Sequence, residues 1–320
     1  MSSPARTPPD QPSVVRDRPG FRVIALPAGP VAPVPKADLP LYLPCFVRQV
    51  LGFAAAEGRR YDLVHSHYWL SGRVGRVVSQ RWGVPHVTMF HTLAEVKNRA
   101  RIGEREPAER ISAERVIINE ADCIIAASQH ERQQLVRLYA ARPEQIAVLP
   151  CGVDLDQFRP RPKLLARAHL GLTARFILLF VGRLEPLKGI DILLRAAAGL
   201  EERADLAVLI VGGAADGYPE EAARLRALAA ECGIAERVHL LGPQPQRHLV
   251  DLYSAADLTV IPSYYESFGL VAVEIAGVRH PRDRLPGRRA HLHRARRRDR
   301  LSHPLAMPRG VPGADRAAPG

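Results

Sequence analysis

Short runs of apolar, β-branched residues alternate with amphipathic stretches along most of the chain, and this alternation constrains the fold more than any other feature. The runs Phe176–Gly182 and Leu206–Gly213 are apolar at almost every position. Amphipathic stretches of helical period, such as Leu70–Trp82 and Glu220–Cys232, lie between such runs. Strands that are apolar on both sides and separated by helices are typical of parallel sheets covered on both faces. We therefore predict an α/β protein.

A break in this alternation predicts where the chain divides. Gly152, Pro160 and Pro162 interrupt the pattern between two apolar runs. Glycine and proline clusters of this kind are typical of linkers. We predict an irregular, proline-rich start (residues 1–20), a first α/β domain (21–160), a second α/β domain (161–277) and an arginine-rich tail (278–320).

The net charge is concentrated at one end of the chain. The formal charge is +12, and nine of these charges lie in residues 278–320, which hold twelve arginines and three aspartates. A basic tail of this kind permits attachment to nucleic acid, with an affinity that falls steeply with salt. The tail lacks interleaved aromatic residues and helical spacing, so we predict small-molecule partners and no nucleic acid.

The cysteines and the apolar runs bear on the compartment. The four cysteines lie far apart, with no Cys-x-x-Cys, so neither a zinc site nor a disulfide framework is indicated. The start of the chain lacks a basic region followed by an apolar run. No apolar run approaches the roughly 18–20 residues that a membrane span needs. We predict a cytoplasmic protein with no transmembrane segment, and leave its oligomeric state open.

Two cations stand five residues apart directly after the predicted strand at 176–182. Arg183 and Lys188 lie in a strand-to-helix loop. Ligands of open parallel sheets bind at the carboxyl ends of the strands. Arginine can hold a phosphate through two donors, lysine adds a point charge, and a helix start adds free N–H groups. The pair predicts an anion site, while incidental charges on a solvated loop are the plainer interpretation.

A second cluster follows the predicted strand at 258–263. Glu266 lies at the tip of that strand, Gly269 permits close approach to the backbone at a helix start, and Glu274 lies about two helical turns further on. Eight helical residues span roughly 12 Å, which is too far for the two carboxylates to act as a close pair on one bond. We expect an extended ligand here. A helix cap with a surface glutamate is the alternative.

Histidines end two predicted strands in the first half of the chain. His65 and His67 lie at the end of one strand, and His91 at the end of the next. A metal site is conceivable, but no acid or cysteine recurs at ligand spacing, which favours hydrogen-bonded rim or core residues. Lys36, Lys97 and Arg110, in the same half, either supply a second anion pocket or are surface charges.

Two long motifs resemble the signatures of a known family. Residues 180–189 read Phe-Val-Gly-Arg-Leu-Glu-Pro-Leu-Lys-Gly, and residues 266–274 read Glu-Ser-Phe-Gly-Leu-Val-Ala-Val-Glu. In order and separation they resemble the family 4 retaining glycosyltransferases. His67–Gly72, Phe90–Asn98 and Gly152–Asp154 resemble the branch that holds inositol-phosphate N-acetylglucosaminyltransferases and sucrose-phosphate synthases. The resemblance runs from about Asp10 to Gly277. It implies the GT-B fold of two Rossmann-like domains facing a cleft, here an N-terminal acceptor-side domain (21–160) and a C-terminal sugar-nucleotide-binding domain (161–277), both incomplete.

The resemblance implies roles for individual residues on the donor side. Arg183 and Lys188 would hold the donor diphosphate and stabilise charge as the nucleotide leaves. Glu266 would bind the donor sugar, Glu274 the ribose, and His91 would contact the transferred sugar. The implied catalytic residues are Arg183, Lys188, Glu266 and His91, and the implied donor-binding residues are Gly182, Arg183, Lys188, Glu266, Phe268, Gly269, Leu270 and Glu274.

The acceptor side and the chemistry follow from the same resemblance. Lys36, Tyr68, Thr92 and Arg110 match positions that hold an acceptor phosphate in the inositol-phosphate branch. The implied reaction transfers a sugar from a UDP-sugar to a hydroxyl acceptor with retention of anomeric configuration, without an established protein nucleophile. No cofactor is obligatory. Mg²⁺ is compatible but not required, because cationic side chains and helix ends do its work.

The chain departs from the family pattern at both ends. The family opens with a strand and a Gly-Gly loop, where this chain has its proline-rich start. After Gly277, the pattern stops. Shifting the reading of the codons for Val278–Arg289 forward by one base can spell Cys-Gly-Ile-Pro-Val-Ile-Ala-Ser-Arg-Val-Gly-Gly, which is how the family continues. We hypothesise that residues 278–320 are a frameshift product, which resequencing across the Gly277 codon would test.

These departures leave two other interpretations beside the enzyme. An incomplete cleft and uncovered apolar faces predict poor solubility and little or no transfer by the 320-residue chain. A sugar-nucleotide-binding remnant without catalysis is therefore one alternative, and nucleic-acid binding through the tail is the other.

Overall fold

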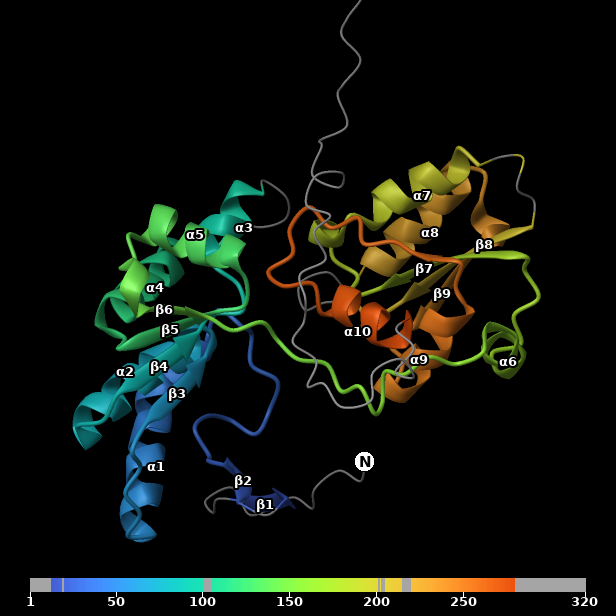
Figure 1. The fold of residues 1–320 in the computed structure, drawn as a ribbon. Coiled ribbons are helices and arrows are strands. Elements are labelled where there is room, and N and C mark those ends of the chain that lie inside the picture. Colours follow the sequence, from blue (N-terminus) through green and yellow to red (C-terminus); the bar gives the residue numbers. More distant parts are fainter. Residues whose placement is uncertain are drawn as a thin grey trace, which may run out of the picture. The chain divides into compact units, whose positions relative to one another are not determined.

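The computed structural model describes residues 13–18, 20–100, 105–200, 202, 205–214 and 220–279. The predicted tail lies outside the described residues apart from its first two positions, so neither its structure nor the frameshift hypothesis is tested. Figure 1 shows two α/β lobes, each built on its own four-stranded sheet.

A small antiparallel hairpin precedes the first lobe. Strand β1 (Ser13–Arg18) pairs with β2 (Phe21–Ala25), and Gly20 lies between them with φ +78°. Part of the stretch that we expected to be irregular is therefore a strand. Its prolines lie mostly before residue 13, while Val14 and Val15 favour extended backbone and Gly20 accepts the left-handed turn.

The first lobe has a parallel sheet of four short strands in the order in which they occur along the chain. The strands are β3 (Val64–His67), β4 (His86–Met89), β5 (Cys123–Ala126) and β6 (Ile146–Val148). The helices are α1 (Leu43–Ala56), α2 (Tyr68–Trp82), α3 (Ala94–Arg99), α4 (Ala108–Glu120) and α5 (Gln129–Tyr139), with 3₁₀ turns η1 (Leu39–Tyr42) and η2 (Pro143–Gln145).

Local sequence explains where the helices of this lobe begin and end. Ser128 accepts a hydrogen bond from the backbone N–H of Glu131 at the start of α5, and Glu131 in turn accepts one from Ala127 N–H. Ser128 is thus the N-cap of α5, while Glu131 binds the N–H one residue earlier than it would in a capping box. Gly83, with φ +67°, ends α2 in the left-handed conformation that glycine adopts without strain.

The second lobe has a parallel sheet in the order β10-β7-β8-β9. Its strands are β7 (Phe176–Val181), β8 (Leu206–Val211), β9 (Val238–Gly242) and β10 (Leu258–Thr259). Its helices are α6 (Lys163–His169), α7 (Ile190–Ala198), α8 (Glu221–Glu231), α9 (Gln246–Ala255) and α10 (Leu270–Arg279), with 3₁₀ turns η3 (Pro186–Lys188) and η4 (Ala235–Arg237).

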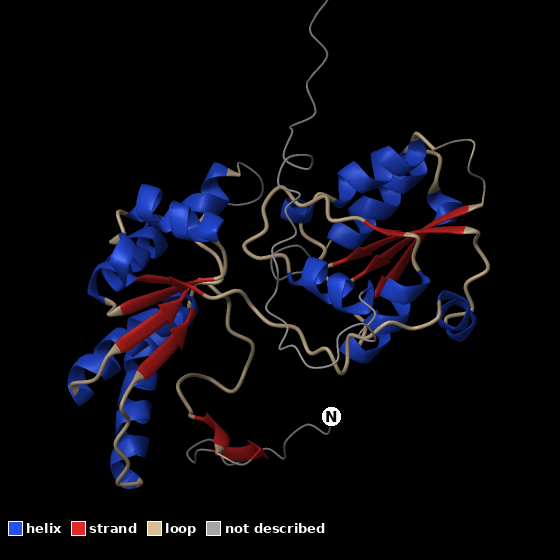
Figure 2. Cartoon of the chain, viewed as in Figure 1, coloured by secondary structure: helices blue, strands red, loops and turns tan. Residues whose placement is uncertain are grey.

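Helices cover both faces of this second sheet, as Figure 2 shows. Phe180, Val208 and Ile210 pack in one core with residues of α7 and α8. The alternate strand positions, such as Leu179 and Leu209, pack in the other core with residues of α9. Every residue of β8 is buried, which is why its sequence is apolar throughout. The two parallel sheets confirm the α/β class.

Gly75 is a point of close packing between α2 and the first sheet. A Cβ atom there would lie 2.6 Å from Nε2 of His86 and 3.0 Å from Cβ of Ser66. We expect Gly75→Ala to lower the free energy of unfolding by about 1–3 kcal/mol, because overpacking displaces buried groups. Gly52→Ala in α1, where nothing lies within 4 Å, is the control and should raise it by about 0.5–1 kcal/mol. Urea denaturation measures both, and equal effects would contradict this packing.

One helical stretch of the described residues qualifies as a membrane span by length and composition alone. This stretch is Leu39–Ala56. Its mean hydropathy is 1.3, and 6% of its residues are buried within the structure. It contains no long unbroken apolar run, because Arg48 and Gln49 lie in its middle. Core helices and signal sequences pass the same test, so the absence of a transmembrane segment stays a prediction.

Candidate functional site

The two loops that carry the predicted anion site are joined to each other through the backbone. The N–H of Tyr264, after β10, donates to the carbonyl of Leu187 in η3 at 3.0 Å. Gly189 has φ +63°, and a Cβ atom there would lie 2.3 Å from the carbonyl oxygen of Pro262. The glycine therefore lets the start of α7 lie directly against the loop after β10.

This junction brings Lys188 and Glu266 together at the carboxyl end of the second sheet. Nζ of Lys188 lies 2.5 Å from Oε1 of Glu266, although 78 residues separate them in sequence. Ser263 Oγ donates to the same carboxylate oxygen at 3.1 Å. The lysine side chain is 17% exposed and the glutamate side chain 33%. A cation and a carboxylate are thus both accessible to a ligand on this edge.

Arg183 follows β7 directly on the same edge. Its side chain is 66% exposed, and its Nη2 lies 3.0 Å from Oε1 of the largely buried Glu185. Gly182, before it, donates its N–H to Val211 at 2.9 Å. The guanidinium therefore extends into solvent from a loop that is fixed at its base.

The second signature forms the start of α10. Gly269 has φ +81° and precedes Leu270, the exposed first residue of the helix, while Phe268 is half-buried. A helix start offers unpaired N–H groups and a partial positive charge. In the second turn, Glu274 accepts a hydrogen bond from the Tyr253 hydroxyl at 2.6 Å. Every predicted donor-side residue of this lobe lies in the β7–α7 loop or the segment from Glu266 to Glu274.

The four predicted acceptor-side residues meet in the first lobe around the ring of Tyr68. Nζ of Lys36 lies 5.7 Å from the ring centroid, and Cζ of Arg110 lies 5.0 Å from it. Nη2 of Arg110 donates to Oγ1 of Thr92 at 3.0 Å and to the Thr92 carbonyl at 2.9 Å. The Tyr68 hydroxyl is buried, without a hydrogen-bond partner among the described residues.

Arg110 is buried to a degree that the sequence did not indicate. Its side chain is 1% exposed and pairs with Glu114, at 2.7 Å, and with Glu106, at 2.8 Å. Glu114 is itself fully buried. Burial opposes the charge on Arg110, but the two carboxylates outweigh it and raise the pKa of the guanidinium. Arg110 is thus held as a cation behind Thr92.

His91 lies in a strained turn after β4. Its φ is +61°, and the N–H of Thr92 donates to the carbonyl of Phe90 across it at 2.7 Å. Such conformations cost energy in residues other than glycine and are found at functional sites. The His91 Nε2 atom forms a 2.9 Å hydrogen bond with His67 Nδ1, and the ring of His65 lies beside His67. Partial burial and then His67 lower the pKa of His91.

These histidines do not form a metal centre in the described part of the chain. No group of three or more histidine, cysteine, aspartate or glutamate residues there is placed to hold a metal ion. The metal independence of the reaction remains a prediction.

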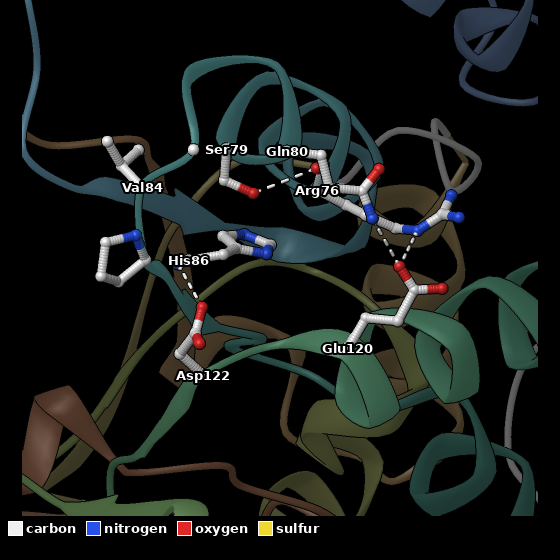
Figure 3. Close-up of a pocket in the computed structure, with 9 residues that line it drawn as sticks. Arg76, Ser79, Gln80, Val84, His86, Glu120 and Asp122 are labelled. Carbon is white, nitrogen blue, oxygen red and sulfur yellow. Dashed lines mark hydrogen bonds and ion pairs between the residues drawn. The ribbon is translucent and has the colours of Figure 1, made fainter.

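A separate polar pocket of about 380 Å³ lies beside the amino ends of β4 and β5 (Figure 3). Asp122 accepts the N–H of His86 at 2.8 Å, and Glu120 pairs with Arg76 at 2.5 Å. Ligands of parallel sheets bind at the opposite, carboxyl ends. The predicted site residues are absent from its lining, so we assign the function elsewhere.

His86 predicts how stability depends on pH. The ring is 2% exposed, and burial lowers its pKa below the ordinary 6.5. Below pH 6.5 the unfolded chain then binds more protons than the native state. The free energy of unfolding therefore has its maximal value above pH 6.5 and decreases as the pH is lowered from there. Urea denaturation between pH 7.5 and 5.5 should show this fall, with a smaller slope in His86→Gln. An equal slope in the variant would contradict the assignment.

Comparison with known proteins decides the family. The model described as Glycosyltransferase Family 4 matches residues 5–157, and the model described as Glycosyl transferases group 1 matches residues 165–281. The chain is 48% identical over 278 residues to the D-inositol 3-phosphate glycosyltransferase of Thermobispora bispora, an alignment that covers 84% of this chain and 65% of that protein. The chain belongs to the family 4 glycosyltransferases.

Other relatives and solved structures agree with this family and with the GT-B fold. This chain is 48% identical over 270 residues to the D-inositol 3-phosphate glycosyltransferase of Nocardia farcinica, covering 82% of this chain and 60% of that protein. Sucrose-phosphate synthase of Thermosynechococcus elongatus is 35% identical, with TM-score 0.74 over 83% of this chain and 66% of the other. Anabaena Alr3699/HepE, solved with UDP-glucose, is 25% identical, with TM-score 0.61 over 72% and 60%.

These alignments also show how much of a relative the chain represents. It spans about 60–65% of the length of the two curated glycosyltransferases named above. The fold and family of the described residues are therefore established, while the activity and substrates of the whole protein are proposals.

Several partners of the site residues were not predicted from the sequence. On the acceptor side, Arg110 pairs with Glu106 and Glu114, and Glu114 accepts a hydrogen bond from Tyr139. On the donor side, Arg183 pairs with Glu185, and Glu274 accepts a hydrogen bond from Tyr253. The spacing of Arg110 and Glu114, four residues apart within α4, is a signal that the sequence does carry. For the two tyrosines the chain carries no local signal, because their partners lie 25 and 21 residues away.

Proposed function

We propose that this glycosyltransferase transfers a sugar from a UDP-sugar to a hydroxyl of a phosphorylated polyol or sugar, with retention of the anomeric configuration. The observation that carries the proposal is the junction of Lys188 and Glu266 beside Arg183 and the start of α10. It offers cations and backbone N–H groups for a diphosphate, together with a carboxylate for sugar hydroxyls.

The donor would be held along this edge of the second lobe. Arg183 and Lys188 would bind the diphosphate, and its arrival would draw Lys188 away from Glu266, freeing that carboxylate for the sugar. The N–H groups at Gly269 and Leu270 would add to the phosphate site. Glu274, held by a tyrosine hydroxyl, would bind the ribose. The complex of Alr3699/HepE with UDP-glucose supports a donor of this class.

The acceptor phosphate would lie near Tyr68 in the first lobe. Lys36 supplies a cation, Thr92 a hydroxyl, and the buried Tyr68 hydroxyl a donor that has no partner among the described residues. Arg110 adds positive charge behind Thr92. The two curated relatives are named for an inositol phosphate, which supports this class of acceptor.

The reaction would occur on one face of the sugar. The bond between the anomeric carbon and the β-phosphate oxygen breaks, and the acceptor oxygen bonds to the same carbon from the same side. The proton of the acceptor hydroxyl passes to the departing phosphate oxygen. Lys188 and Arg183 stabilise the charge that develops on that phosphate, a role in which no metal is required. His91 would contact the sugar.

A transfer assay beside a donor titration tests this function. The 320-residue chain, and a chain in which the reading frame after Gly277 is restored, are given UDP-glucose or UDP-N-acetylglucosamine with D-inositol 3-phosphate, and products are identified by mass and by the NMR coupling of the anomeric proton. The proposal predicts that the restored chain gives one glycosylated phosphate product whose anomeric configuration matches that of the donor, and that the 320-residue chain gives little or none. Saturable donor binding without transfer by the restored chain would support a sugar-nucleotide-binding remnant, and an inverted product would contradict the mechanism.

A further inference from the structure

Each lobe buries a tyrosine whose hydroxyl donates to the carboxylate of a glutamate on a neighbouring helix. Tyr139, at the end of α5, donates to Oε2 of Glu114 in α4. Tyr253, in α9, donates to Oε2 of Glu274 in α10. The two tyrosines are 6% and 1% exposed. Neither is among the residues proposed to contact a substrate. Tyr253 contacts such a residue, Glu274, directly, whereas Tyr139 is connected to Thr92 through Glu114 and Arg110.

In the first lobe, Tyr139 and Glu114 replace a missing helix cap. Helix α3 begins after Leu93, which has no side chain able to cap it. The first N–H of the helix, from Ala94, donates to Glu114 at 3.0 Å, and the second, from Glu95, donates to the Tyr139 hydroxyl at 2.9 Å. The first turn of α3 is therefore held by side chains of α4 and α5.

This capping fixes the segment that immediately precedes α3. His91 and Thr92 lie three and two residues before the first helical residue. The carboxylate of Glu114 also accepts from Nε of Arg110, whose Nη2 donates to Thr92. Tyr139 thus stands at the end of a buried chain of hydrogen bonds that leads through Glu114 and Arg110 to Thr92.

In the second lobe the chain is shorter. Glu274 receives the hydroxyl of Tyr253 directly, and Tyr253 is fixed by packing in the core with Phe158, ring to ring at 6.3 Å. Burial, and then the hydrogen bond to Glu274, raise the pKa of Tyr253; burial and then Glu114 raise that of Tyr139. Both hydroxyls therefore keep their protons and act as donors at neutral pH.

We propose that Tyr139 and Tyr253 are positioning residues, the first for the acceptor half of the site through Thr92, and the second for the donor half through Glu274. This inference rests on the proposed function, because it assigns each tyrosine to the binding of one of that function's two substrates. Each tyrosine acts through a carboxylate that its hydroxyl orients, and neither touches the reacting atoms.

Removing one hydroxyl at a time tests the division, with each variant as the control of the other. Tyr139→Phe and Tyr253→Phe each lose a single oxygen with the ring retained. Calorimetric titration with D-inositol 3-phosphate and with UDP should show a crossed pattern. We expect Tyr139→Phe to weaken the inositol phosphate about tenfold and leave UDP unchanged, and Tyr253→Phe to do the reverse, as a lost hydrogen bond to a charged group would. Equal weakening of both ligands by either variant would overturn the inference.

A second measurement needs no substrate and so separates this inference from the proposed function. Hydrogen exchange at the amides of Ala94 and Glu95 reports the capping of α3 directly. We expect exchange to be about tenfold faster in Tyr139→Phe and unchanged in Tyr253→Phe. If the wild-type chain binds neither ligand, the proposed function fails while this result still decides the role of Tyr139. Unchanged exchange at both amides would overturn that role, whatever the binding data show.

Discussion

Arg110→Leu is expected to lower the free energy of unfolding by about 3–5 kcal/mol, because it leaves the carboxylate of Glu114 buried without its cation. Glu114 is fully buried, and Glu106 would lose the same partner. The measurement is urea denaturation of the purified chain, followed by circular dichroism.

A neighbouring arginine on the same helix is the matched control. Arg115 also lies on α4 and pairs with Glu95 at 3.2 Å, but its side chain is 55% exposed. We expect Arg115→Leu to change stability by about 0–1 kcal/mol, as exposed ion pairs do. If the two variants cost the same, the claim that Arg110 is a buried structural cation behind Thr92 is wrong.

Lys188→Ala is expected to weaken UDP-glucose binding by about 10–100-fold, because it removes a charge-assisted hydrogen bond to the diphosphate. Where transfer is measured, turnover should fall by about 10²–10³-fold, since the lysine also stabilises the leaving phosphate. Calorimetry gives the affinity, and consumption of the UDP-sugar gives the turnover.

Lys163→Ala removes the same charge from the second lobe and serves as the control. Lys163 is exposed and pairs with Asp257, which keeps its contact with Arg167 at 2.7 Å. Asp257 precedes β10, so this pair lies at the amino end of the sheet, away from the proposed donor site. UDP-glucose affinity should be unchanged. If Lys163→Ala lost as much affinity as Lys188→Ala, the effect would come from the net charge of the lobe, and the proposed contact of Lys188 with the diphosphate would be contradicted.

The sequence was sufficient to predict the second sheet because its two central strands, β7 and β8, are apolar throughout. Runs such as Leu206–Gly213 can be buried on both faces only in a covered sheet, and β8 lies within that run. The loops after β7 and β10 were likewise predictable as site loops, because parallel strands place their carboxyl ends on one edge. Lys188 and Glu266 accordingly lie together.

What escaped prediction depends on contacts between distant segments. Arg110 and Glu114 pair within α4, but Tyr139 of α5 reaches Glu114 only in the folded lobe. The same holds for Tyr253 and Glu274. The strand at Ser13–Arg18 was missed for a different reason: the prolines of the preceding residues dominated the local composition. Hydrogen bonds that a fold brings together leave no periodic signal in a sequence.

The most direct test of the donor site is to map where UDP binds by the amide chemical shifts of the isotope-labelled chain. We predict saturable shifts at Arg183, Lys188, Gly269 and Leu270, with the amides around His86 unaffected. Absence of binding, or shifts confined to the pocket beside His86, would contradict the assignment of the donor site to the carboxyl edge of the second sheet.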